Sequence, residues 1–92
     1  MAAYLIACHE VTDPTGFKEW RAKAVPIIQR HGGRVVVRSD KVEVLDGDSK
    51  ASDVVVIEFS DRSALDAARA EMKEHSAMRQ KSARTVLLAV EA

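Results

Sequence analysis

Residues Asp53-Val54-Val55-Val56-Ile57-Glu58-Phe59 give the clearest structural signal in this 92-residue chain. Four consecutive β-branched residues, Val54 to Ile57, favour a strand over a helix. A short apolar run without alternation is typical of a strand that is buried on both faces. The segment therefore predicts a central strand, and the rest of the chain has to supply its neighbours and its cover.

Working outward, the pattern predicts further strands and two helical regions. Residues 3–11 and 85–90 have strand composition, and residues 34–38 and 41–45 form two short β-rich runs around Ser39-Asp40, which predicts a tight hairpin. Apolar residues recur at helical spacing from Pro14 to His31, and again after the capping residues Ser60 and Asp61. The order β-α-β-β-α-β predicts an α+β, ferredoxin-like antiparallel sheet with both helices on one face, built as one domain over residues 1–92.

Composition narrows the classes of function. Fourteen basic and fourteen acidic residues cancel, which argues against a general nucleic-acid binder and a polybasic membrane anchor. A lone cysteine, Cys8, excludes an internal disulfide framework and a multi-cysteine metal site. No segment approaches the ~20 apolar residues of a membrane span. We expect a soluble, cytoplasmic protein that contacts neither nucleic acid nor membrane.

A sheet with helices on one side leaves its other face bare, and in so short a chain only a second copy is left to cover it. We therefore expect a homodimer. Alternation along the strands assigns Val35, Val37, Val42 and Val44, with Val55, Ile57 and Phe59, to the helix side. To the bare side it assigns Arg34, Val36, Arg38, Glu43, Leu45, Val54, Val56 and Glu58, together with Tyr4, Ile6, Cys8 and Glu10.

Charges on the bare side are costly unless they are paired. One interpretation is an Arg–Glu network that fixes how two subunits meet. The other is a polar cavity that holds a small molecule, for which the candidate binding residues are Tyr4, Glu10, Trp20, Arg34 and Glu58.

Metal and cofactor chemistry have little support in the sequence. His9, His31 and His75 lie in three different elements without helical pairing, so we predict no metal site. Gly32-Gly33 follows a helix instead of opening one, which excludes a phosphate loop, and we predict no cofactor. His9 is interpreted as a buried, hydrogen-bonded core residue, and Trp20 with Phe17 as core or as a stacking platform for a flat ligand.

Several motifs resemble a known family: Val25-Pro26, His31-Gly32-Gly33-Arg34, Val37-Arg38, Val42-Glu43-Val44-Leu45-Asp46-Gly47 and Val55-Val56-Ile57-Glu58-Phe59. They resemble the bacterial domain-of-unknown-function family 1330 of the dimeric α+β-barrel superfamily. The resemblance covers nearly the whole chain and implies a ferredoxin-like homodimer, but no reaction. Residues 69–76 depart from the family, which usually has a tyrosine-containing segment where His75 stands here.

Three functions remain open: a small-molecule-binding dimer, a cofactor-independent enzyme of the monooxygenase, isomerase or lyase type, and a purely structural dimer. For the enzyme, analogy with the superfamily suggests Glu43 as general base, with Glu10 or Glu58 as alternatives. It suggests Arg38 as anion holder and His75 as acid–base partner.

Overall fold

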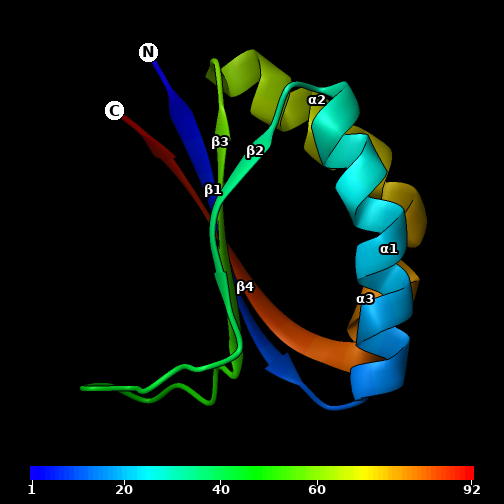
Figure 1. The fold of residues 1–92 in the computed structure, drawn as a ribbon, viewed down its shortest axis with the longest axis vertical. Coiled ribbons are helices and arrows are strands. Elements are labelled where there is room, and N and C mark those ends of the chain that lie inside the picture. Colours follow the sequence, from blue (N-terminus) through cyan, green and yellow to red (C-terminus); the bar gives the residue numbers. More distant parts are fainter.

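A computed structural model describes residues 1–92 as one sheet with helices on one side (Figure 1). The elements are β1 (Ala3–Val11), α1 (Pro14–Arg30), β2 (Arg34–Ser39), β3 (Asp53–Phe59), α2 (Arg62–Met72), the 3₁₀ turn η1 (Lys73–His75), α3 (Ser76–Ser82) and β4 (Ala83–Glu91). None of the helices combines the length and the apolar character that a membrane span requires.

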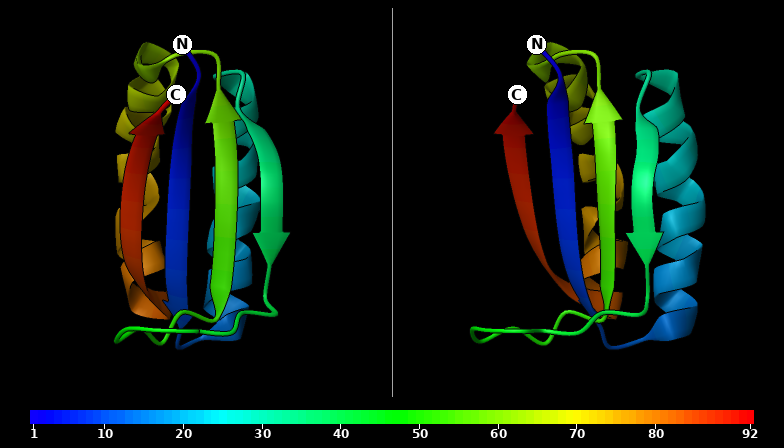
Figure 2. Two further views of the ribbon diagram at one scale, coloured as in Figure 1. Left: turned by 90° about the vertical axis from the view of Figure 1, so that its left-hand side faces the viewer. Right: turned by 60° about the vertical axis from the view of Figure 1, so that its left-hand side comes forward.

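The sheet has the order β2-β3-β1-β4, and every neighbouring pair is antiparallel. Figure 2 shows its uncovered face with β3 and β1 in the middle. The predicted ferredoxin-like arrangement with helices on one face is confirmed, and 53–59 is a central strand as expected.

The helix boundaries follow from local chemistry. Asp13 caps α1 by accepting a hydrogen bond from the Gly16 amide, with proline at the first helical position. Asp61 caps α2 by accepting from the Ala64 amide. The α1 helix ends at His31 and Gly32, whose φ of +75° favours glycine.

The predicted hairpin at Ser39-Asp40 is wrong. Strand β2 is followed by an irregular loop over residues 40–52, and β2 pairs instead with β3. Because β2 is an edge strand of the sheet, residues 41–45 have no strand of this chain to pair with. They therefore form no strand despite their β propensity. The loop projects beyond the sheet on the side away from the helices (Figure 1).

A β-bulge between Val35 and Val37 corrects part of the predicted face assignment. Val35 lies opposite Ile57, but beyond the bulge Val37 lies opposite Val56 and Arg38 opposite Val55. The extra residue reverses the alternation. Val37 therefore lies on the bare side and Arg38 on the helix side, the reverse of the sequence prediction.

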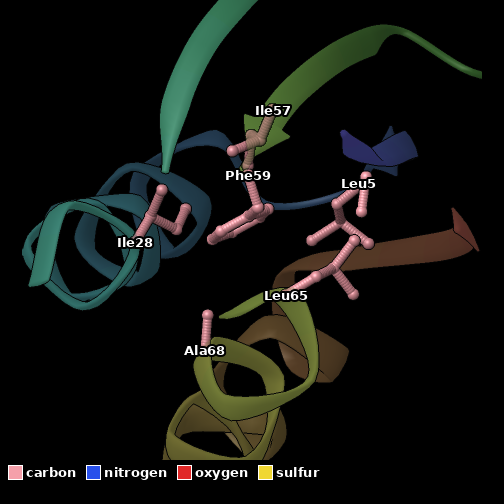
Figure 3. Close-up of a cluster of buried hydrophobic side chains, with 7 residues drawn as sticks. Leu5, Ile28, Ile57, Phe59, Leu65 and Ala68 are labelled. Carbon is pink, nitrogen blue, oxygen red and sulfur yellow. The ribbon is translucent and has the colours of Figure 1, made fainter. Parts of the chain in front are cut away.

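Two buried clusters lie between sheet and helices. The larger, drawn in Figure 3, joins the sheet to α1 and α2 through Leu5, Ile28, Ile57, Phe59, Leu65 and Ala68, with Ala3. The smaller joins Phe17, Trp20 and Ala24 of α1 to Ala83 at the start of β4. The space between these clusters is incompletely filled, and this space positions the candidate site.

Candidate functional site

One cavity of the molecule lies between the sheet and the helices, not on the bare face. It has a volume of about 130 Å³, and apolar side chains make up most of its lining. We call it the helix-side pocket. Its apolar lining includes Leu5, Ala7, Phe17, Trp20, Ala24, Val25, Ile28, Val35, Val55, Ile57, Met72 and Leu87.

Two helical stripes supply the walls. Phe17, Trp20, Arg21, Ala24, Val25 and Ile28 recur along α1 at spacings of three and four, so all of them face the sheet. A second stripe runs through α2, η1 and α3 at the same spacing, through Arg69, Met72, Lys73, Ser76 and Arg79. All four strands contribute to the floor, β2 through Val35 and Arg38, since residues on one side of the sheet point to the helices.

His9 is the buried polar residue of the floor. Its side chain is 1% exposed, and Nδ1 lies 2.7 Å from the hydroxyl oxygen of Thr85 on the neighbouring strand. The ring makes edge contacts with Phe17 and Trp20, at centroid distances of 4.8 and 5.6 Å. Burial lowers the pKa of His9 to about 4, with Arg79 and Arg21 adding to the effect and Asp53 opposing it. His9 is therefore neutral at neutral pH, and its interpretation as a buried, hydrogen-bonded residue is confirmed.

Asp53 supplies the negative charge beside His9. The residue is 5% exposed, and its carboxylate accepts a hydrogen bond of 2.9 Å from Arg38, while Arg21 lies 3.9 Å away. Residues 53 and 9 are direct partners across β1 and β3. The two arginines thus compensate the charge of Asp53 at this end of the pocket.

Arg79 reaches the pocket from α3. Its buried Nε has no hydrogen-bond partner, and burial together with the nearby Arg69 lowers the pKa of the guanidinium. Arg69 and Lys73 line the same wall. None of these three cations takes part in an ion pair of this chain.

The bare face is an apolar surface with one polar network. It consists of Ile6, Cys8, Val37, Val54, Val56, Val86, Leu88 and Val90, with Tyr4, Glu10, Arg34, Glu58 and Arg84. Tyr4 donates a 2.9 Å hydrogen bond to Glu58, and Arg34 donates one of 2.8 Å to the same carboxylate. The bond from Arg34 lowers the pKa of Glu58, and the carboxylate raises the pKa of Tyr4.

The structure separates the sequence-derived candidates into groups. Tyr4, Arg34 and Glu58 meet on the bare face, with Glu10 further along β1, whereas Trp20 and Arg38 line the helix-side pocket. Glu43 lies exposed in the 40–52 loop, and the half-buried His75 lies in η1 outside the lining. Glu43, His75 and Arg38 are therefore not assembled within one copy of the chain, and their catalytic roles remain predictions.

Sequence reasoning did not single out Asp53, Arg69, Lys73 or Arg79. A signal for three of them exists: Arg69, Lys73 and Arg79 share a helical stripe with Met72 and Ser76, where a core-facing stripe should contain only apolar residues. No three His, Cys, Asp or Glu side chains gather in the geometry of a metal site.

Comparison with known proteins identifies the family of this chain. A family model described as "Domain of unknown function (DUF1330)" matches residues 2–92, which confirms the resemblance drawn from the motifs. No curated protein shows significant sequence similarity to the chain.

Several solved structures share the fold. A protein of unknown function from Rhodopseudomonas palustris has a TM-score of 0.77 at 14% identity, over 99% of this chain and 82% of its own. SnoaB, a cofactor-independent oxygenase from Streptomyces nogalater, has a TM-score of 0.71 at 17% sequence identity, and the match covers 99% of this chain and 92% of SnoaB. A dimeric ferredoxin-like protein of unknown function from Jannaschia sp. CCS1 has a TM-score of 0.68 at 15% sequence identity, and the match covers 100% of both chains. At these identities the likeness shows a shared fold alone.

Proposed function

We propose that this chain, which belongs to the DUF1330 family of unknown function, binds a small molecule in the helix-side pocket. The observation that supports the proposal is the cavity itself, because a volume of about 130 Å³ bounded by packed elements is far larger than ordinary packing defects. An apolar cavity of about 150 Å³ accepts a benzene-sized molecule. The pocket therefore suits a ligand that places about one ring inside it, or an aliphatic body of similar size.

The polar groups of the pocket fit this function. Ligand sites are mainly apolar, with a few polar groups that fix orientation. His9, held by Thr85 and neutral, offers a ring nitrogen without charge, while Phe17 and Trp20 offer aromatic faces beside it. A flat ligand would contact the aromatic residues and exchange a hydrogen bond with His9.

A fragment titration followed by ¹H–¹⁵N NMR tests the proposal. Trp20 is the only tryptophan, so its indole N–H gives a single cross-peak that reports directly on the pocket. We expect aromatic fragments to shift this cross-peak. Shifts confined to bare-face residues such as Ile6 and Leu88 would contradict the proposal.

Two alanines of α1 provide a matched pair of variants. Ala24 is buried and lines the pocket, whereas Ala22 is exposed on the same helix. Ala24→Leu fills the pocket and should weaken fragment binding about tenfold or more, while Ala22→Leu should not change it. Equal binding by both variants, each with native-like spectra, would count against this site.

The bare face supports a homodimer as the binding unit. Val86, Leu88 and Val90 of β4 are 60%, 50% and 43% exposed, a contiguous apolar row next to Ile6 and Cys8. Such a face is typical of a protein–protein interface. The neighbour from Jannaschia is described as dimeric, and a second copy would cover this row and the Tyr4–Glu58–Arg34 network.

A second candidate function is cofactor-independent oxidation of a phenolic or enolic substrate, in keeping with the oxygenase of the same fold. The specific observation is His9, which is neutral and oriented by Thr85 and so keeps a ring nitrogen that can accept a proton. Because burial lowers its pKa to about 4, His9 is a weak base, and the substrate proton has to be acidic. It would take a proton from the substrate, whose carbanion then reacts with dioxygen; one oxygen enters the product and the other leaves as water.

Dioxygen uptake with an anthrone or a phenol as substrate tests this candidate. We expect uptake by the wild type and a strong loss in His9→Gln. Glu43→Gln and His75→Ala test the roles predicted for those residues, since full activity in both variants would contradict them. If no such substrate causes dioxygen uptake, the oxygenase candidate is wrong, and the proposal that the pocket binds a small molecule still stands.

A further inference from the structure

We propose that the natural ligand of the helix-side pocket is an organic carboxylate with an apolar, ring-sized body, and that Arg79, Arg69 and Lys73 bind its carboxylate group. The inference rests on the proposed function and specifies its ligand class. It comes from the distribution of charge around a cavity in a chain with no net charge.

The pocket collects positive charge out of proportion to the rest of the molecule. The chain has equal numbers of basic and acidic residues. Around the pocket, however, five cations face one carboxylate: Arg21, Arg38, Arg69, Lys73 and Arg79 against Asp53. A cavity lined by one sign of charge with apolar walls raises the local concentration of the opposite ion.

Asp53 does not compensate the whole excess. Its carboxylate is engaged by Arg38 at 2.9 Å and Arg21 at 3.9 Å. The α2–α3 wall contributes Arg69, Lys73 and Arg79, and no acidic residue on that wall lines the pocket. Of the nearest acidic residues along the chain, Glu71 is engaged by Arg30 and His31, and the exposed Glu74 neither lines the pocket nor forms an ion pair. Three cations are therefore left for a ligand.

Arg79 gives the clearest sign of a missing partner. Its Nε is buried without an acceptor, and an unpaired buried donor on a charged group is among the costlier features of a folded chain. A carboxylate accepts two parallel N–H bonds from a guanidinium. Because Nε is shielded from solvent, Arg79 has to turn this edge towards the pocket for one ligand group to satisfy the donor. The neighbouring Arg69 and Lys73 would add attraction from the more exposed part of the wall.

The remaining lining sets the shape of the ligand. Phe17, Trp20 and Leu87 are apolar and His9 is uncharged. Arg38 and Asp53, the charged residues on the floor, are engaged with each other, so the α2–α3 wall holds the unengaged charge. A ligand charged at one end and apolar elsewhere matches this arrangement. A multiply charged or wholly polar anion would leave the aromatic wall unused.

Three isosteric probes test the inference: 1-naphthoate, neutral 1-naphthamide and cationic 1-naphthylmethylammonium, each titrated against the Trp20 indole cross-peak. We expect 1-naphthoate to bind about tenfold more tightly than the amide, as hydrogen bonds to charged groups predict, and the ammonium to bind most weakly. Added salt should weaken the binding of naphthoate and leave that of the amide unchanged.

Variants identify the cations responsible. Arg79→Gln should reduce naphthoate affinity about tenfold and leave amide affinity unchanged. Arg69→Gln and Lys73→Gln, at exposed positions, should each reduce naphthoate affinity about two- to threefold. Lys81→Gln removes one charge from an exposed position of the same helix α3 outside the pocket, and should have no effect.

The outcomes separate the two proposals. If amide and naphthoate bind equally, or if the ammonium binds most tightly, the carboxylate inference is wrong and the pocket still binds ligands. The inference is equally wrong if Lys81→Gln reduces the affinity for naphthoate as much as the three pocket variants do. If none of the probes shifts the Trp20 cross-peak, the proposed function fails and the inference falls with it.

Discussion

His9 links the stability of the protein to pH. In the unfolded chain a histidine titrates near its ordinary pKa of about 6.5, whereas in the folded protein burial lowers the pKa of His9 to about 4. Between these values the unfolded chain binds a proton that the native state excludes. The native state is therefore not penalised by His9 above about pH 6.5, and it loses stability as the pH falls towards 4.

The loss should be measurable by urea unfolding. Between about pH 7.5 and about pH 5 the wild type should lose about 2 kcal/mol through this one group. His9→Gln has no group that titrates there and should show a correspondingly flatter dependence, even if its stability at neutral pH is lower. Parallel curves for the two proteins would contradict a neutral, buried His9.

Tyr4 allows an independent test of the bare-face network. Its hydrogen bond to Glu58 and the negative charge of that carboxylate raise the pKa of Tyr4 above about 10. Because Tyr4 is the only tyrosine, absorbance near 295 nm reports its ionisation alone. Glu58→Gln should return the midpoint towards 10, with circular dichroism confirming that the fold persists; an unchanged midpoint would exclude the contact.

At the scale of the elements, the α1–β2 connection depends on two glycines for different reasons. A Cβ at Gly33 would lie 2.5 Å from Cγ2 of Ile28 and 2.8 Å from Cε1 of Phe59, whereas a Cβ at Gly32 would meet nothing within 4 Å. Gly32 is needed for its φ of +75° instead. Packing therefore requires a glycine at position 33, and backbone conformation requires one at position 32.

Replacement by alanine and asparagine separates these constraints. Gly33→Ala should cost about 1–3 kcal/mol by overpacking the core, and Gly33→Asn more. Gly32→Ala should cost about 1 kcal/mol, and Gly32→Asn less, because asparagine tolerates positive φ. The free energy of unfolding measures all four variants; an asparagine that is better tolerated at 33 than alanine would refute the packing argument.

The elements also show how far the sequence determines the site. Alternation along β1 and β3 predicts which side chains face the helices, and His9 follows from it. The β-bulge at Val35–Val37 is a single extra residue with no sequence mark, so Val37 and Arg38 were placed on the wrong sides. The pocket could not be predicted, since it is the unfilled space between two clusters whose residues are far apart in sequence.

At the scale of the whole molecule, the isolated chain exposes more surface than a free monomer of its size. Its accessible area is 5948 Å², against roughly 5,300 Å² expected for a monomeric protein of this mass. The projecting 40–52 loop and the apolar row on β4 account for excess of this kind, since both lie where no other part of the chain covers them (Figures 1 and 2). The excess supports a second copy on the bare face.

Charge placed in the bare face should separate the copies. Leu88 lies opposite Ile6 in the middle of the apolar row, so Leu88→Glu would bury an unpaired carboxylate and weaken dimerisation about tenfold or more. Ala67→Glu adds the same charge at an exposed position of α2 and should leave the dimer intact. In sedimentation equilibrium the wild type should have twice the 10.1 kDa of one chain; a monomer would refute the interface.

An isotope-filtered NOE experiment on the protein with 1-naphthoate shows whether the helix-side pocket is the binding site. Protons of the naphthalene ring should give cross-peaks to Trp20, Ala24, Met72 and Leu87, which all line the pocket. Cross-peaks to Ile6, Val56 and Leu88 instead would place the ligand on the bare face and contradict the claim.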